Sequence, residues 1–321
     1  MLASSLSGAR EIAMSRERLF MKINTGYIAF ALALSLNATI SSAELGININ
    51  PNDYVKNGNF YYLTGDCDRA ITEYEKESAQ GSANASNTLG SSVYLPISGT
   101  QACLRPNFSL AMEYLELATK QGSPSAPHTI GQVFSGTANL IGADVAINFE
   151  LANKYYSLAA SRGNSEAMIT LGNNYLLGKN GVSKSPKVAY KYFLEAAMSD
   201  DRVGKEMVGI SHLEGVGVPK NHKIARQYFL DAKTEGSFYH LGRMYQEGLG
   251  VKINKPLSYV LYSLAESYAL YSAEMSARVG KKKDDLEKAL AKNDIDAAQS
   301  LYQQLFTTSV IKVAEYIRTF D

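Results

Sequence analysis

The chain has 321 residues, of which 45% are hydrophobic and 20% are charged, so it is long enough to bury a full core. Its formal net charge of +1 gives no electrostatic reason to expect a nucleic acid or a strongly acidic partner. Tyrosine is plentiful, with 21 residues, whereas tryptophan is absent. This imbalance suggests an aromatic position that recurs along the chain.

Residues 21–43 have the layout of a secretory signal peptide. A basic start at Lys22 precedes an apolar run over residues 27–36, and the small residues Ser41 and Ala43 suit cleavage after Ala43. The run is shorter than the about 20 apolar residues that span a bilayer; a buried helix is the alternative. Three methionines are possible starts: Met1, Met14 and Met21. We therefore expect a periplasmic or secreted protein.

Cys67 and Cys103 are the two cysteines of the chain. An oxidising compartment favours a disulfide between them. The two cysteines are 36 residues apart. In the chain-entropy model, closing a loop of this length stabilises a fold by roughly 3–4 kcal/mol. The alternative is a redox-active pair, but such pairs usually have a Cys-x-x-Cys spacing. The spacing therefore favours a structural disulfide.

One small position recurs along the chain every 33–41 residues. Its members are Ala70, Ala111, Ala152, Ala189, Ala225 and Ser258. Seven residues later, with Glu77 as the exception, stand Ala118, Ala159, Ala196, Ala232 and Ala265. Residues seven apart lie on one helical face, so small ones let a neighbouring helix approach closely. Aromatic residues follow the first alanine by three or four positions and are predicted to face the small positions of the adjacent helix: Tyr74, Tyr114, Tyr155, Tyr156, Tyr192, Phe193, Tyr228, Phe229 and Tyr262.

Eleven residues after the alanine comes a position that is predicted to end the helix in a left-handed conformation. It is occupied by Gly81, Gly122, Gly163, Asp200 and Gly236. A second helix is then marked by an aliphatic residue followed by glycine: Leu89-Gly90, Ile130-Gly131, Leu171-Gly172, Val208-Gly209 and Leu241-Gly242. Glycine inside a helix costs about 1 kcal/mol relative to alanine, so its recurrence indicates a packing requirement. Three residues after the glycine stand Val93, Phe134, Tyr175, His212 and Tyr245.

A Gly-x-Gly-Val loop leads from this second helix to the next alanine helix, as in "HLEGVGVPKNHKIARQYFLDA" at residues 212–232. A phosphate-binding loop would occur once, after a strand. Because this loop recurs in register with the repeat, we interpret it as an architectural joint. Gly215 and Gly248 are expected to end helices, and two helices per unit of this length predict a helical solenoid.

The segments "EAMITLGNNYLLGKNGVSKSPKVAYKYFLEAA" (166–197) and "YHLGRMYQEGLGVKINKPLSYVLYSLAES" (239–267) resemble the Sel1-like repeat, a relative of the tetratricopeptide repeat. The resemblance implies an all-α, right-handed superhelical solenoid of helix-turn-helix repeats. We expect the signal peptide and upstream residues over 1–43, an N-terminal cap over residues 44–69, repeats over 70–270 and capping helices over 271–321. The usual Asp of the family's loop is replaced by Ser185 and Asn221.

Stacked helix pairs leave an extended concave surface that can hold a peptide or a helix of another protein. We therefore expect a non-enzymatic scaffold or adaptor that binds a protein partner and needs no cofactor. The polar residues beside the aromatic positions are the candidate contacts: Asn173, Asn174, Arg243 and Gln246. A scaffold for a polysaccharide synthesis or export complex is the main alternative.

Enzymatic and metal chemistry have little support in the residues. Relatives linked to β-lactam binding suggest a hydrolase as a minor alternative, but Ser309 and Lys312 form a Ser-x-x-Lys with no Ser-Asp-Asn or Lys-Thr-Gly. None of the four histidines pair at the spacing of a helical metal site. His212 takes the place of an aromatic residue and is predicted to be packed, whereas His222 is predicted to be a solvated loop residue.

Overall fold

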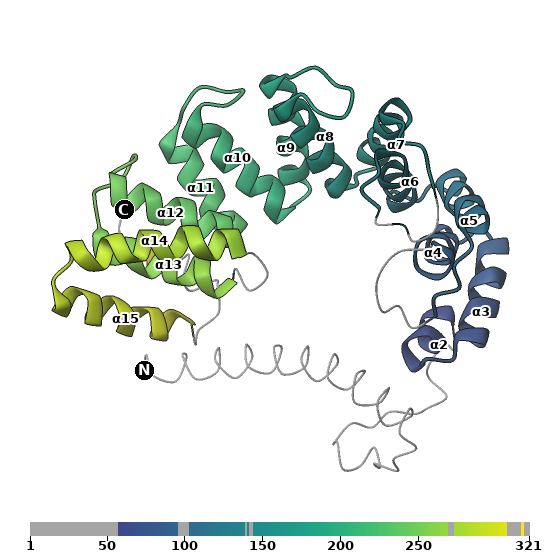
Figure 1. The fold of residues 1–321 in the computed structure, drawn as a ribbon, viewed down its shortest axis with the longest axis horizontal. Coiled ribbons are helices and arrows are strands. Elements are labelled where there is room, and N and C mark those ends of the chain that lie inside the picture. Colours follow the sequence, from purple (N-terminus) through teal and green to yellow (C-terminus); the bar gives the residue numbers. More distant parts are fainter. Residues whose placement is uncertain are drawn as a thin grey trace, which may run out of the picture. The chain divides into compact units, whose positions relative to one another are not determined.

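The computed structural model describes residues 57–95, 103–138, 140, 144–268, 273–306 and 316–317. The expected signal peptide and the Ser309–Lys312 pair lie outside these residues. The described part contains fourteen α-helices and one π-helix (Figure 1), so the expectation of an all-α fold is confirmed. None of the helices in this part is both long and apolar enough to cross a membrane.

The chain divides into two compact units, with the boundary inside helix α6 after Thr129. The first unit contains α2 (Gly58–Thr64), α3 (Cys67–Ala79), α4 (Ala83–Thr88), the π-helix η1 (Leu89–Tyr94), α5 (Phe108–Lys120) and the start of α6 (Ser125–Ser135). The second contains the rest of α6, α7 (Phe149–Ser161), α8 (Ser165–Leu177), α9 (Pro186–Met198), α10 (Arg202–Glu214), α11 (His222–Ala232), α12 (Glu235–Glu247), α13 (Lys255–Tyr268), α14 (Ala273–Ala289) and α15 (Lys292–Phe306).

Each alanine helix packs against the glycine-marked helix that precedes it, and we call each such pair a hairpin. A Cβ atom at Gly131 would lie 2.7 Å from the Tyr156 ring, and one at Gly209 would lie 2.6 Å from the Phe229 ring. These distances are well below carbon–carbon contact, so the glycine makes room for the ring. The same relation joins the pairs Gly58–Tyr74, Gly172–Phe193 and Gly242–Tyr262, and Gly90 makes room for the Leu115 side chain in the same way. The predicted packing requirement is therefore confirmed.

The small positions of the alanine helices form the centre of this packing. Ala111, Ala118, Ala225 and Ala232 are fully buried, and the other small members of both columns are at most 1% exposed. In the first alanine helix, where Glu77 breaks the pattern, the buried residue is Ser78. The predicted close approach of neighbouring helices therefore extends over the whole repeat.

A backbone hydrogen bond closes each hairpin at its loop. The N–H of the residue that caps the alanine helix donates to the carbonyl of the aromatic residue in the preceding helix, as in Asn148 to Phe134 at 2.8 Å and Ser185 to Tyr175 at 2.7 Å. The same bond joins Asn107 to Tyr94, Asn221 to His212 and Asn254 to Tyr245. The side chains of all four asparagines also accept an N–H from the first turn of their helix, which is the usual role of an N-cap.

The π-helix η1 shifts the aromatic position of the first described repeat by one residue from the position predicted by sequence spacing. Its Leu95 N–H donates to the Gly90 carbonyl five residues back, at 3.0 Å, which is π-helical pairing. The extra residue in this turn moves Tyr94 into the position that simple counting assigned to Val93. Tyr94 stacks on Tyr114 there, with ring centroids 5.6 Å apart.

The predicted helix ends are correct at four positions and wrong at one. Gly81, Gly122, Gly163 and Asp200 all have positive φ angles. Gly236 instead lies inside α12, and the preceding helix α11 ends at Lys233 with a φ of 53°. The reason is that α11 is two residues shorter than most of its counterparts, while Gly236 is needed where the Glu206 carboxylate of α10 approaches α12.

The Gly-x-Gly-Val loops join neighbouring hairpins. Gly215 and Gly248 have φ angles of 74° and 73° and end α10 and α12, as expected. The second glycine of each loop lies on the first residue of the preceding alanine helix: Gly217 on Pro186 of α9, and Gly250 on His222 of α11. His222 is therefore a partly buried helix residue, and the prediction of a solvated loop position was wrong.

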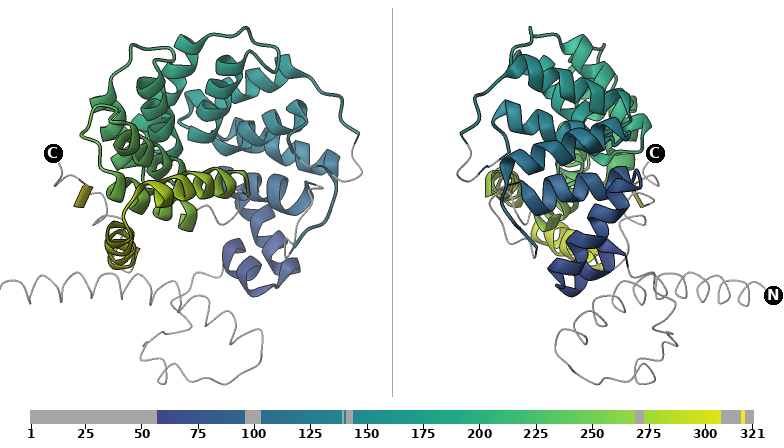
Figure 2. Two further views of the ribbon diagram at one scale, coloured as in Figure 1. Left: turned by 60° about the vertical axis from the view of Figure 1, so that its left-hand side comes forward. Right: turned by 90° about the vertical axis from the view of Figure 1, so that its right-hand side faces the viewer.

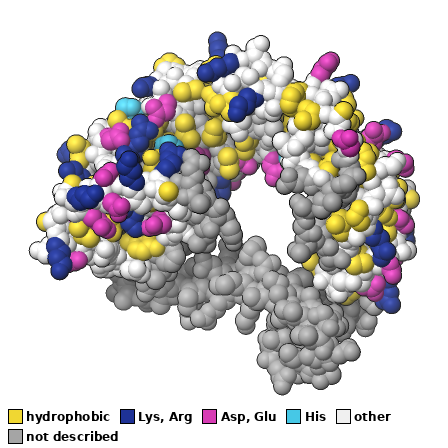
Figure 3. Space-filling model, viewed as in Figure 1, with side chains coloured by type: hydrophobic (Ala, Val, Ile, Leu, Met, Phe, Trp, Pro, Cys, Tyr) yellow, Lys and Arg dark blue, Asp and Glu magenta, His cyan; other side chains and the backbone are white. Residues whose placement is uncertain are grey.

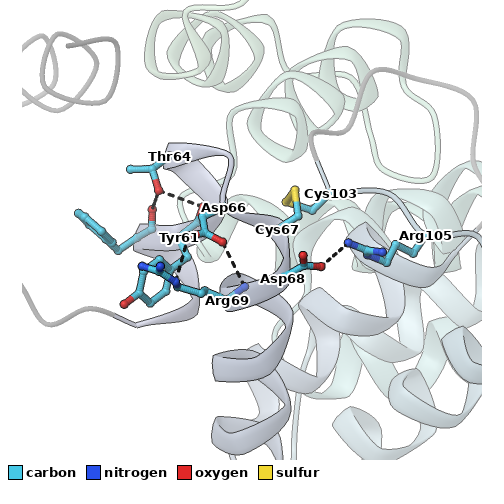
Figure 4. Close-up of a disulfide and its surroundings, with 9 residues drawn as sticks. Tyr61, Thr64, Asp66, Cys67, Asp68, Arg69, Cys103 and Arg105 are labelled. Carbon is cyan, nitrogen blue, oxygen red and sulfur yellow. Dashed lines mark hydrogen bonds and ion pairs between the residues drawn. A yellow bond between two sulfur atoms is a disulfide. The ribbon is translucent and has the colours of Figure 1, made fainter. Parts of the chain in front are cut away.

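The two ends of the described chain carry additional elements. In the second unit, α14 and α15, drawn in the yellow end of the colour scale in Figure 2, pack against α13. They contribute the buried residues Val279, Leu286 and Ala298. In the first unit, Cys67 at the start of α3 and Cys103 before α5 form the expected disulfide (Figure 4), with their Cα atoms 5.1 Å apart. The adjacent Asp68–Arg105 ion pair, 2.6 Å long, is largely exposed.

Candidate interaction surface

Stacked aromatic side chains recur at one register of the second unit. Phe134 stacks on Tyr155 with ring centroids 6.3 Å apart, and Tyr175 stacks on Tyr192 with centroids 5.9 Å apart. All four side chains are partly exposed. The first member of each pair stands three residues after the helix glycine, at the position that His212 and Tyr245 take in the next two hairpins. We call these six residues the aromatic row.

His212 fills its place in the row as a packed residue, as predicted. Its Nε2 lies 3.2 Å from the Tyr190 hydroxyl, and the two rings meet edge to face with centroids 5.6 Å apart. The side chain is buried, and its Nδ1 has no hydrogen-bond partner among the described residues. His212 therefore links α10 to α9 of the preceding hairpin.

Tyr245, the last member of the row, is held by a buried arginine. The Arg226 guanidinium donates to the Tyr245 hydroxyl through Nε at 3.2 Å and through a terminal nitrogen at 2.9 Å. The same terminal nitrogen donates to the backbone carbonyl of Ile317 at 3.1 Å. Ile317 is fully buried in the same apolar cluster as Tyr245. A residue close to the end of the chain thus covers this position.

The two candidate asparagines differ in their surroundings. Asn173 is partly exposed. Asn174 is only 6% exposed, and its amide donates to Asn153 at 3.4 Å and accepts from the Asn180 amide at 2.9 Å. Asn174 therefore holds the loop that follows α8 against α7, whereas Asn173 presents part of its side chain to solvent.

Arg243 and Gln246 are partly exposed on α12, and both are engaged by neighbours. Arg243 pairs with Glu214 of α10 at 2.5 Å and with Glu247 at 3.3 Å. The hydrogen bond from Arg243 holds the pKa of Glu214 below its usual value. Gln246 accepts a hydrogen bond from the Tyr262 hydroxyl at 2.8 Å, and burial raises the pKa of that hydroxyl.

Sequence reasoning missed the position that directly follows the alanine. It holds Asn153, Tyr190 and Arg226, and each of these side chains bonds to the glycine-marked helix of the following hairpin. The three residue types differ, so no pattern indicated a shared role. The alanine spacing alone, which places this position beside the next hairpin, was the available signal.

Charge is distributed evenly over the face shown in Figure 3. Acidic and basic side chains are intermingled there instead of gathering into an area of one sign. Within the described residues, no group of three or more His, Cys, Asp or Glu side chains could hold a metal ion.

Comparison with known proteins agrees with this architecture. No curated protein matches the sequence significantly. A Sel1 repeat protein from Oxalobacter formigenes has a similar structure, with a TM-score of 0.60 and 18% identity over 77% of this chain and 98% of its own. A protective antigen of uropathogenic Escherichia coli displaying an SLR fold gives a TM-score of 0.49 and 18% identity, over 82% of this chain and 62% of its own.

A family model is matched five times along the chain. The model is that of the Sel1 repeat, and it matches residues 89–123, 131–164, 165–201, 205–237 and 239–267. From the third to the fifth match, each covers all or most of one hairpin, with the glycine-marked helix first and the alanine helix second. Sel1 repeats typically serve as protein–protein interaction scaffolds. The chain belongs to the Sel1 repeat family.

Proposed function

We propose that this protein is a non-enzymatic scaffold or adaptor that binds a protein partner along the aromatic row. The observation that carries the proposal is the repetition of partly exposed, stacked rings at one register, Phe134–Tyr155 and Tyr175–Tyr192. Tyrosine offers apolar area together with a hydroxyl and is enriched at protein interfaces. A surface of this kind binds through contact area and needs no cofactor.

Photo-crosslinking in intact cells, followed by recovery of the protein with its adducts, tests the proposal. Probes replace Asn173 and Gln246, which flank the row and are partly exposed. A third probe replaces Met198, which is 79% exposed at the end of α9 and serves as the control. We expect one protein adduct of the same mass from Asn173 and Gln246 and none from Met198. Equal labelling from all three positions, or no protein adduct, would contradict the proposal.

We also propose that the protein acts outside the cytoplasm. Two features support export: the signal-like segment over residues 21–43 and the Cys67–Cys103 disulfide, a bond that persists in oxidising compartments. Intact-mass measurement of the cellular protein tests this. We expect a chain that begins at Glu44 and whose cysteines resist alkylation until they are reduced. A retained N-terminus with two free thiols would overturn the proposal.

A further inference from the structure

The last position of the aromatic row, at Tyr245, lies next to Ile317 of the same chain. Tyr316 and Ile317 have helical backbone, and the Ile317 side chain is fully buried while its carbonyl accepts a hydrogen bond from Arg226 at 3.1 Å. Because Arg226 also donates to the Tyr245 hydroxyl, one charged group joins the row to the covering backbone. An aliphatic residue on a helical turn is therefore an occupant that this surface accepts.

Equivalent positions of the row differ in what covers them. Tyr245 and Tyr175 have the same register, since each carbonyl accepts the N–H of the residue that caps the next helix, Asn254 and Ser185 respectively. Tyr245 is 3% exposed, whereas Tyr175 stays partly exposed. The same holds for Phe134 one hairpin earlier. The row is thus continuous with a position at which an aliphatic residue of the chain, Ile317, is buried in the same apolar cluster as Tyr245.

We propose that the two uncovered positions, at Phe134–Tyr155 and Tyr175–Tyr192, bind an amphipathic helix of a protein partner through aliphatic side chains. This inference rests on the proposed function and specifies the chemistry of the partner. The two positions lie on successive hairpins, which are joined by the packing of α7 on α8. Residues seven apart on a helix are separated by about 10 Å and lie on one face, so a partner helix with aliphatic residues seven apart can present one to each position.

A suitable probe is a peptide with the sequence of residues 307–321, TTSVIKVAEYIRTFD. It carries Val310 and Ile317, which are seven residues apart. The chain contains no tryptophan, so Tyr175→Trp in the full-length protein creates a single fluorescent reporter in the row. Met198→Trp is the matched control outside the row, and Tyr192→Trp is a second reporter if the first variant folds poorly.

We expect the peptide to shift the emission of Tyr175→Trp to shorter wavelength in a saturable manner, because burial removes the indole from water. A peptide with Ile317→Asp is expected to bind at least tenfold more weakly, and Met198→Trp is expected to show no shift. Absence of a shift at either row reporter up to about 1 mM peptide, a free energy of only about −4 kcal/mol, would overturn the inference. So would equal shifts from the two peptides.

The experiment separates this inference from the proposed function. If the peptide does not bind but crosslinking through Asn173 and Gln246 still captures one partner, protein binding stands and the aliphatic-helix chemistry is wrong. If the peptide shifts neither row reporter but binds a full-length Ile317→Asp variant, only the last position accepts it. The C-terminal turn is then a cap, and the inference is likewise wrong.

Discussion

At Gly172, the space of a missing side chain is filled by the Phe193 ring of the next helix. A bulky side chain, which is an aromatic ring in every hairpin except that of Gly90 and Leu115, occupies the space beside each of these glycines. This packing explains why a residue unfavourable in helices recurs in the glycine-marked helices. The close packing of the two helices in a hairpin therefore depends on the absence of a Cβ atom at this glycine.

Replacing Gly172 with alanine is expected to destabilise the protein by about 1–3 kcal/mol. The new Cβ would overlap the Phe193 ring, and the cost of overpacking exceeds the helix-propensity gain of about 1 kcal/mol. Gly280→Ala in α14 is the matched control, because a Cβ there meets nothing within 4 Å. We expect that control to be neutral or stabilising by up to about 1 kcal/mol. Urea unfolding of both variants measures the difference, and equal effects would contradict the packing argument.

His240 makes stability depend on pH. Burial, and then the positive charge of Arg243, lower its pKa to about 4, while Glu214 opposes the shift. Its ring stacks on Phe229 with centroids 5.2 Å apart, and its buried Nδ1 has no hydrogen-bond partner among the described residues. The folded state therefore favours the neutral imidazole.

The sign of the pH effect follows from that lowered pKa. Between about pH 6.5 and 4 the unfolded chain binds the proton and the folded chain does not, so stability is lost as the pH falls through this window. The shift corresponds to at most about 3 kcal/mol. His240→Phe is expected to flatten the acid limb of the stability curve, which chemical unfolding at pH 7, 5.5 and 4.5 would measure. An unchanged acid limb would show that other groups cause it.

At the scale of single elements, the asparagine caps set where the alanine helices begin. Asn148 caps α7 through its side chain, which accepts the Leu151 N–H at 3.0 Å. Ser185, at the equivalent position of α9, makes no such side-chain bond. The backbone bond to the preceding helix is present in both loops, so the two positions differ in the side-chain cap alone.

Asn148→Ala is expected to cost about 1 kcal/mol, the usual value of an N-cap side chain, whereas Ser185→Ala is expected to change stability by less than about 0.5 kcal/mol. Both substitutions leave the backbone closing bond intact. Thermal unfolding monitored by far-UV circular dichroism compares the two variants. A loss at Ser185 as large as that at Asn148 would mean that the side-chain cap is not the stabilising interaction.

At the scale of the whole molecule, the repeat array consists of local contacts. Each hairpin packs mainly on its sequence neighbours, so stability in one part is transmitted only weakly to another. The disulfide lies entirely in the first compact unit, where it ties the start of α3 to the segment before α5. Its effect should therefore be confined to that unit.

Replacing both Cys67 and Cys103 with serine is expected to destabilise the first unit by roughly 3–4 kcal/mol and to leave the second nearly unchanged. Hydrogen exchange measured by mass spectrometry resolves the units: protection should fall in α3 and α5 and persist in α10–α13. Wild type treated with reductant should match the variant. Uniform loss of protection along the chain would contradict the local character of the array.

The sequence by itself determined the all-α repeat, the alanine columns, the packing role of the helix glycines, the loop joints and the disulfide partners. These features follow from residue size, helical periodicity and cap chemistry, which act between elements close together in the chain. The assignment of Asn173 and Gln246 as partner contacts stays a prediction, and both side chains are partly exposed.

Only the tertiary structure decided the rest. The π-helical turn that brings Tyr94 onto Tyr114, the early end of α11 at Lys233 and the burial of Asn174 each depend on which side chains a neighbouring helix presents. The contact between Arg226 and Ile317 joins residues 91 positions apart. No local pattern encodes such a pairing, because its favourable energy exists only once α11, α12 and the C-terminal turn have been brought together.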